Sequence, residues 1–487
     1  MDKILYCIFL TGLWLVPATL QSTRPTHNDN VTKSDKNLTV TSNHTFPYTI
    51  IDGEVSTLYF NYILEPDSKV PAGLDGWVVT AVVDHDKLVN IVSNSVFHIH
   101  TTNLSGTLSI SLKGKLPGRA TLIFQGRDEV TGAEDGVFKS DVKVYSQTSF
   151  ELHIERQEKT IDIAFNVIIV ILVVLANVGM GAKVDLSVVK TQLRRPFAPI
   201  IGLFSQFVFM PVIAFMVAYT LKLDPGIALG LFALGCSPGG SASNAYTYLL
   251  DGNVSLSVTM TLISTLASLG LLPMWLFTLG RVVYSEAKVK IPFENIFFSL
   301  LGIVIPVVVG FILQRKYPKA AICFIKAVKY IMIVFILFIL TVGVYANLYI
   351  FSLMTGEVLL ASALLPYVGF ILGGLAAFIC RQNLANIITI AVETGIQNTG
   401  IPIVLLRLSL TGPDKDTSIV SPIASAIFTP IPLLFGILFV QLRKCILANM
   451  NIIEDSGKEI SQSGKESSKA SLKEPDNLSE TNHEDFK

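Results

Sequence analysis

Long runs of apolar residues between about positions 163 and 442 constrain the fold of this chain more than any other feature. Each run is long enough to cross about 30 Å of hydrocarbon. The backbone in each run must be helical, because hydrocarbon offers no partner to a free N–H or C=O group. We therefore predict a polytopic α-helical membrane protein with about nine spans. The spans cover residues 163–181, 196–219, 225–249, 253–279, 292–314, 325–348, 358–379, 384–408 and 418–442.

The composition agrees with a membrane protein and excludes other classes. Hydrophobic residues make up 51% of the 487 residues, charged residues make up 15%, and the formal net charge is zero. Without a basic excess there is no electrostatic case for a nucleic-acid partner. The sequence shows no nucleophile–base pair, metal-ligand cluster or phosphate-binding loop, so we do not expect an enzyme.

The first residues are typical of a cleavable secretory signal, which we place at residues 1–21. They contain the basic residue Lys3, a short apolar stretch and small residues near Ala18. An uncleaved membrane anchor is the alternative. The polar segment 22–45 follows, and we predict that it is glycosylated outside the cytoplasm. The glycosylation sequons are at Asn30, Asn37, Asn43 and Asn103.

Residues 46–155 form short segments of alternating polarity, separated by turn residues such as Pro117-Gly118. This spacing predicts an all-β sandwich domain of immunoglobulin-like type. The domain contains no cysteine, so its core must hold it together without disulfides. We interpret its histidines as ordinary strand residues. The predicted strands are Thr57–Leu64, Gly76–Asp84, Lys87–Val92, Val96–Thr101, Gly106–Leu112, Arg119–Gln125 and Gly136–Tyr145.

A glycosylated N-terminal segment predicts that the first span starts outside and that the C-terminus is cytoplasmic. Basic residues are more frequent in the predicted cytoplasmic loops, as the positive-inside rule requires. The predicted outer loop with Arg281, Lys288 and Lys290 is an exception. We predict that residues 449–487 are a disordered cytoplasmic tail, because they are polar and almost free of aromatic residues. The expected location is the secretory pathway, with the plasma membrane as the default destination.

Two triplets of predicted spans resemble each other. The segment around Pro211 in the second span is similar to the segment around Pro366 in the seventh, and Pro273 and Pro430 close the two triplets. One triplet starts inside and the other outside, so the repeats are inverted. Inverted repeats with a broken helix in each half are typical of secondary transporters, whose binding sites lie at the repeat interface.

Glycine and proline interrupt one span in each triplet. The third span contains Pro238, Gly239 and Gly240, and the eighth contains Gly395. Backbone groups freed by such breaks cannot face lipid, so they must line a protein or water cavity.

Glu393 is the only acidic residue deep in any predicted span. A charge there costs about 2.5–3.5 kcal/mol even on a lenient insertion scale, and a bound cation would offset that cost. A structural carboxylate, either protonated or hydrogen-bonded, is the alternative. Sodium prefers hard oxygen ligands, as other hard cations do. Suitable neutral oxygens occur at Gln206, Ser243, Asn244, Ser257, Thr261, Gln397 and Asn398.

Three motifs of this chain resemble the bile acid:sodium symporter family, also called solute carrier family 10. They begin at Cys236, Asp251 and Glu393 and read CSPGGSASN, DGNVSLSVTMT and ETGIQN. The similarity covers about residues 160–445, which we take as the membrane domain. A signal and an extracytoplasmic domain ahead of the spans resemble one branch of that family.

The resemblance implies two sodium sites at the crossing of the broken helices. The first would consist of Ser243, Asn244, Ser257, Thr261 and Glu393. The second would consist of Gln206, Glu393 and Gln397, with the backbone carbonyls of Thr394 and Ile396. It also implies that the two triplets form a core and that the first, fifth and sixth spans form a panel. Transport would then occur by alternating access, with the core and the panel moving against each other.

We therefore expect a sodium-coupled symporter of an organic anion, such as a bile acid or a sulfated steroid. Its partners would be sodium ions, the anion and the lipid bilayer, with no cofactor beyond the co-transported sodium. The sequence leaves the oligomeric state open. Two alternative functions also stay open: transport of a different carboxylate, and a receptor or adhesion protein that uses the β-domain.

Overall fold

The computed structural model describes residues 38–42, 44–64, 76–100, 105–128, 144–157, 159–182, 186–194, 196–285, 293–338, 341 and 343–446. The predicted signal, the predicted cytoplasmic tail and all four predicted glycosylation sites lie outside the described residues.

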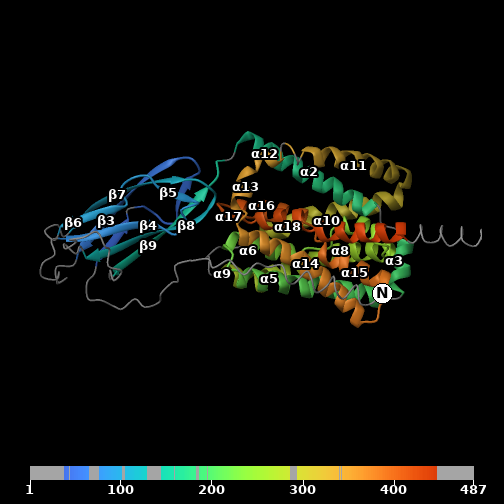
Figure 1. Ribbon diagram of the computed structural model, residues 1–487. Helices are drawn as coiled ribbons and strands as arrows, with labels where there is room; N and C mark the ends of the chain where they lie inside the picture. The colour runs from blue at the N-terminus through green and yellow to red at the C-terminus, as the bar shows by residue number, and fades with distance from the viewer. Residues whose placement is uncertain are drawn as a thin grey trace, which may run out of the picture.

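Two β-sheets form the N-terminal part of the described chain (Figure 1). One sheet has the strand order β1-β3-β7-β5 and the other β2-β9-β8-β4-β6. Neighbouring strands are antiparallel except β2 and β9, which are parallel. The strands are β1 (Leu38–Ser42), β2 (Tyr48–Ile51), β3 (Val55–Leu64), β4 (Gly76–Val83), β5 (Val89–Ile91), β6 (Val96–His100), β7 (Ser105–Gly114), β8 (Gly118–Asp128) and β9 (Val144–Glu155).

The two sheets share one apolar core. Buried and exposed side chains alternate along β7, as expected for a strand with one covered face. Phe60 of the first sheet meets Phe124 of the second with ring centroids 4.7 Å apart, and both side chains are fully buried. Burial of each such side chain contributes about 1.5–3 kcal/mol. The contact between the two sheets therefore rests on apolar packing.

Six of the predicted strands correspond to β3 through β8. The first eight residues of the predicted seventh strand, Gly136–Tyr145, lie outside the described residues, and its last two belong to β9, which continues to Glu155. The overlooked signal is the alternation of Phe150, Leu152 and Ile154 with polar residues. The short strands β1 and β2 were not predicted either. β1 lies inside the segment 22–45, and its pairing with β3 comes from distant residues.

The rest of the described chain is mostly helical, and residues 430–446 continue as helix after the labelled helices. The labelled helices are α2 (Thr160–Ala182), α3 (Leu186–Leu193), α4 (Phe197–Phe204), the π-helix η1 (Ser205–Phe209), α5 (Met210–Thr220), α6 (Pro225–Gly235), α7 (Ser243–Leu249), α8 (Val254–Phe277), α9 (Leu279–Ser285), α10 (Phe293–Lys316), α11 (Pro318–Phe338), α12 (Val344–Ala346), α13 (Leu348–Leu353), α14 (Gly356–Ile379), α15 (Leu384–Gly395), α16 (Gly400–Ser409), α17 (Asp414–Thr417) and α18 (Val420–Phe428).

Among the described residues, five helical stretches are long and apolar enough to cross a membrane. They are Thr160–Ala182, Phe197–Thr220, Val254–Val282, Gly356–Ile379 and Asp414–Ile446. The helical part is therefore a membrane domain, and the count of nine spans stays a prediction. The third and eighth predicted spans are each two shorter helices, α6 with α7 and α15 with α16.

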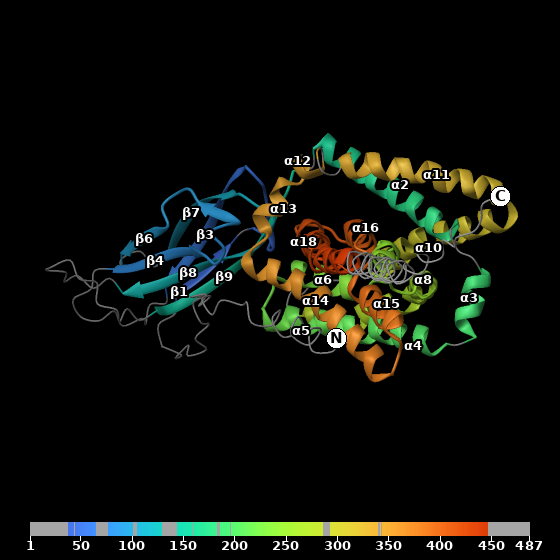
Figure 2. The same cartoon turned by 45° about the vertical axis from the view of Figure 1, so that its right-hand side comes forward.

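Helices α2, α10 and α11 pack against one another. In both views α2 and α11 run along one edge of the helical domain (Figures 1 and 2). Glycines allow α2 and α10 to approach closely. A Cβ atom at Gly181 would lie 2.0 Å from the Val307 carbonyl oxygen, and one at Gly310 would lie 2.0 Å from that of Val178. Small residues at such contacts are typical of membrane helices.

Candidate functional site

The two interrupted helices cross at their breaks and bond to each other through the backbone. The Gly240 N–H donates to the Ile396 carbonyl at 2.8 Å, and the Asn398 N–H donates to the Pro238 carbonyl at 2.9 Å. Gly239 and Gln397 form an antiparallel bridge between them. Each break therefore provides partners for backbone groups that the other break leaves free, which a membrane interior requires.

Glycine is needed at this crossing because no side chain would fit. A Cβ atom at Gly239 would lie 2.7 Å from Glu393 Oε1, and one at Gly240 would lie 2.8 Å from the Gln397 carbonyl oxygen. On the other helix, a Cβ atom at Gly395 would lie 2.2 Å from the ring of Phe370. Gly239 therefore allows the crossing backbone to approach the carboxylate of Glu393, and Gly240 and Gly395 allow close packing at the two breaks.

Glu393 of α15 is the ionisable group at the crossing, and it is only 1% exposed. Ser257 Oγ donates to its Oε2 at 2.9 Å, and Thr261 Oγ1 donates to its Oε1. Both hydroxyls come from one face of α8, because they are four residues apart. Among the described residues, no lysine, arginine or histidine forms an ion pair with Glu393.

Gln206 reaches the same region from the π-helix η1. Its Nε2 donates to Gln397 Oε1 at 2.7 Å and to the Ser237 carbonyl at 2.8 Å. Gln397 Nε2 in turn donates to the Thr394 carbonyl at 3.0 Å. π-Helical turns are rare and occur often at functional sites. This network ties the second predicted span to both breaks.

Several buried oxygen atoms at the crossing have no hydrogen-bond partner among the described residues. They include Gln206 Oε1, Asn244 Oδ1 and Thr394 Oγ1. Ser243 Oγ lies close to Glu393 but makes no well-formed hydrogen bond. Unpaired buried oxygens are rare and call for an explanation. Gln206 lines the same small cavity as Glu393, and an unpaired oxygen beside a carboxylate suits a hard cation.

The structure brings most of the predicted site residues together. Ser257, Thr261 and Glu393 are in direct contact, and Gln206, Gln397 and Thr394 form the second network. The Ile396 carbonyl accepts the Gly240 N–H.

Asn398 was also suggested as an oxygen ligand for the cation. Its side-chain oxygen instead accepts the Ile401 N–H at 3.3 Å and so caps α16.

Ser264 is a site residue that the sequence analysis missed. Its Oγ accepts the Gly239 N–H at 3.3 Å. With Gln206 and Glu393 it also lines a small cavity between α4, η1 and α8. Ser257, Thr261 and Ser264 follow the spacing of one helix face, and that spacing is the signal that could have identified Ser264.

A buried carboxylate at the crossing of two interrupted membrane helices is typical of the class of secondary transporters. Residues 169–355 match the model of the Sodium Bile acid symporter family. The ileal sodium/bile acid cotransporter of Oryctolagus cuniculus is 31% identical over 288 residues, which cover 58% of this chain and 82% of that protein. The Homo sapiens protein of the same name is 30% identical over 302 residues, 61% of this chain and 85% of that protein.

A third relative carries a different name. The sodium-dependent organic anion transporter of Homo sapiens is 29% identical over 303 residues, which cover 61% of this chain and 78% of that protein. The chain belongs to the sodium bile acid symporter family, as its motifs predicted. The β-sheets of residues 38–155 precede the residues that match the family model.

Proposed function

We propose that this protein is a sodium-coupled symporter of an organic anion, such as a bile acid or a sulfated steroid. The observation that carries the proposal is Glu393, a buried carboxylate with hydroxyl donors and, among the described residues, no basic partner. A bound cation would offset the cost of such a charge in the membrane. Relatives that are named sodium/bile acid cotransporters and sodium-dependent organic anion transporters support the same cation and substrate class.

Two sodium sites share Glu393 in this proposal. The first consists of Ser243, Asn244, Ser257, Thr261 and Glu393. The second consists of Gln206, Glu393 and Gln397, with the carbonyl groups of Thr394 and Ile396. Asn244 Oδ1 supports the first site and Gln206 Oε1 the second, because each atom is buried and has no hydrogen-bond partner among the described residues.

Sodium coupling follows from where these ligands lie. They belong to both interrupted helices, to η1 and to α8, so the two bound ions together would hold four segments in one arrangement. That arrangement would admit the anion between this core and the panel of α2, α10 and α11. Alternating access then moves one body against the other around the site.

The membrane potential and the sodium gradient would drive uptake. Each net positive charge that moves inward gains about 2.3 kcal/mol per 100 mV. Each tenfold sodium gradient adds about 1.4 kcal/mol per ion. Two sodium ions with one monovalent anion would make the cycle electrogenic. In this proposal the β-domain faces the outside of the plasma membrane and the C-terminus faces the cytoplasm.

The test is uptake of labelled taurocholate and estrone sulfate by cells that express the full chain, in sodium and in choline medium. We expect uptake in sodium only, and we expect Glu393→Gln to abolish it at matched surface level. The control is Glu357→Gln, which changes a partly exposed carboxylate at the start of α14. Sodium-dependent uptake that survives Glu393→Gln would refute the role of Glu393. If the intact surface protein takes up neither anion, the proposed substrate class is wrong.

A further inference from the structure

A cavity of about 100 Å³ lies between α2 of the panel and α16 of the core. Its walls are mostly apolar, whereas its end nearest the β-domain is polar. The lining residues are Asn166, Ile169 and Val170 of α2, Ile403, Val404, Arg407 and Leu408 of α16, and Lys415 of α17. Two cationic side chains and no carboxylate therefore line it.

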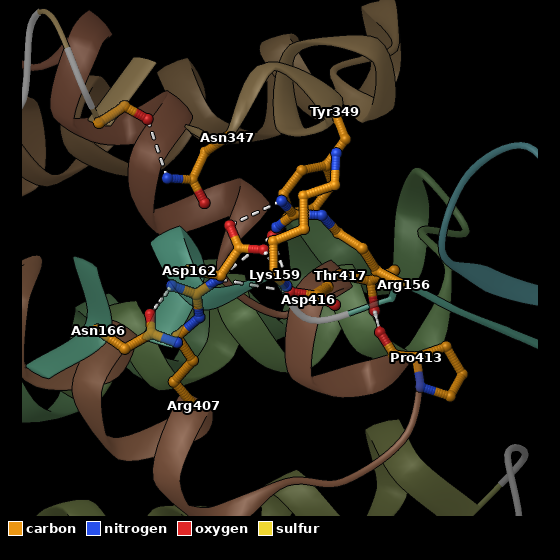
Figure 3. A network of polar contacts seen from close by, with 11 residues as sticks. Arg156, Lys159, Asp162, Asn166, Asn347, Tyr349, Arg407, Pro413, Asp416 and Thr417 are labelled. Atoms are coloured by element: carbon orange, nitrogen blue, oxygen red, sulfur yellow. Dashed lines mark hydrogen bonds and ion pairs between the residues drawn. The ribbon is translucent and has the colours of Figure 1, made fainter. Parts of the chain in front are cut away.

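Arg407 is the central polar group of this cavity, and its side chain is only 10% exposed. It donates to Asn166 Oδ1 from one terminal nitrogen. The other terminal nitrogen lies 3.3 Å from the Tyr349 hydroxyl and 3.5 Å from Asp416 Oδ1 (Figure 3). Its Nε is buried and has no hydrogen-bond partner among the described residues. A buried donor of this kind is rare in proteins.

Two of the three neighbouring carboxylates pair with other cations, and the third, Asp416, is the ion-pair partner of Arg407. Asp162 pairs with Arg156 at 2.7 Å, and Asp414 pairs with Arg119 at 2.6 Å. Asp416 accepts the Tyr349 hydroxyl at 2.7 Å, closer than it lies to Arg407. Arg407 therefore has one long ion pair, to Asp416 at 3.5 Å, and keeps a buried Nε donor without a partner among the described residues.

We propose that this cavity binds the anionic end of the transported molecule, with Arg407 as the residue that binds its carboxylate or sulfate. The inference rests on the proposed function and adds the position of the charge. Arginine suits these groups because its donors match their oxygens. A cavity of about 100 Å³ is smaller than the 300–1,000 Å³ that encloses a drug-sized ligand, so it holds one end of the molecule. The apolar walls then contact the carbon atoms next to the charge.

The test measures the half-saturating anion concentration for sodium-dependent uptake of estrone sulfate. Loss of a charge-assisted hydrogen bond predicts an increase of about tenfold or more for Arg407→Gln. Arg407→Lys keeps the charge and should give a smaller increase. Lys415→Glu reverses the charge of a second residue that lines the cavity and leaves Arg407 in place. It should also raise the half-saturating anion concentration. The matched control is Lys319→Gln, an exposed cation at the start of α11.

A second measurement separates this proposal from the proposed function. Estrone sulfate should raise the thermal unfolding temperature of the purified full-length protein, and Arg407→Gln should shift that titration to higher concentrations by a similar factor. Binding that depends on Arg407, without sodium-driven uptake, would refute the symport proposal but support the site. Unchanged half-saturation in Arg407→Gln, or a change in maximal rate alone, would overturn the assignment of Arg407. An intact protein that neither binds nor transports estrone sulfate would overturn it as well.

Discussion

Trp275 illustrates, at the scale of a single residue, how a helix with a proline is stabilised inside a membrane domain. Pro211 has no N–H group, so the Phe207 carbonyl loses the partner it would have in a regular helix. Trp275 Nε1 of α8 donates to that carbonyl at 2.8 Å. The bond supports the π-helix that carries Gln206, although Trp275 itself lies outside the proposed sodium sites.

Trp275→Phe should therefore destabilise the protein. It keeps an aromatic ring but removes the donor to the Phe207 carbonyl, at a cost of about 0.5–1.5 kcal/mol. We expect a lower thermal unfolding temperature for the purified protein, and a higher half-saturating sodium concentration for uptake because Gln206 loses support. Tyr219→Phe removes an exposed hydroxyl from α5 and should change neither value. If Trp275→Phe behaves like this control, the bond has no structural importance.

At the scale of elements, the glycine contacts between α2 and α10 define the panel. The two contacts are reciprocal, since each helix places one glycine against a carbonyl oxygen of the other. The apolar sequence of these helices would also allow packing through larger side chains. The close approach is therefore a property of the pair of helices and not of either one.

Gly181→Ala or Gly310→Ala should force the two helices apart. The added methyl group would lie 2.0 Å from a backbone oxygen, which cannot rotate away as a side chain can. Overpacking of this kind costs about 1–3 kcal/mol. Thermal unfolding of the purified variants should show the loss. Gly302→Ala on the same α10 has no atom within 4 Å of the new Cβ and should be neutral or slightly stabilising. Equal stability of all three variants would contradict this packing.

At the scale of the whole molecule, an ion pair joins the β-domain to the helical core. Arg119 of β8 donates to both carboxylate oxygens of Asp414 in α17, at 3.2 and 2.6 Å. The side chains of Arg119 and Asp414 are only 18% and 6% exposed. Figure 2 shows the β-domain at the end of the helical domain near α13. The docking therefore fixes the β-domain against the segment that links α16 to α18.

Arg119→Gln should loosen this docking without unfolding either part. We expect the amide protons of residues 412–418 to exchange at least about tenfold faster in deuterated buffer, because loss of a charged hydrogen bond costs about 1.5–3 kcal/mol. Lys113→Gln changes an exposed cation of β7 and should leave that exchange unchanged. Exchange in Arg119→Gln at the rate of the control would show that other contacts hold the β-domain.

The sequence by itself determined the features that depend on local pattern. The apolar runs predicted the membrane helices, the alternation predicted β3 to β8, and Pro238 and Gly239 predicted one of the breaks. These features can be predicted from the sequence because the local backbone geometry and the burial of each face depend on residues close together in the chain. Glu393 was recognisable for a similar reason, since a carboxylate is rare in an apolar run.

Only the tertiary structure decided which distant groups meet. The bond from Gly240 to Ile396, the support of Phe207 by Trp275 and the ion pair of Arg119 with Asp414 each join segments far apart in the sequence. The cavity at Arg407 likewise exists only because α2 and α16 lie side by side. The sequence pattern does not identify these partners, because many other polar residues of the chain could form a hydrogen bond with the same group. The packing of the helices and sheets selects the one that lies within reach.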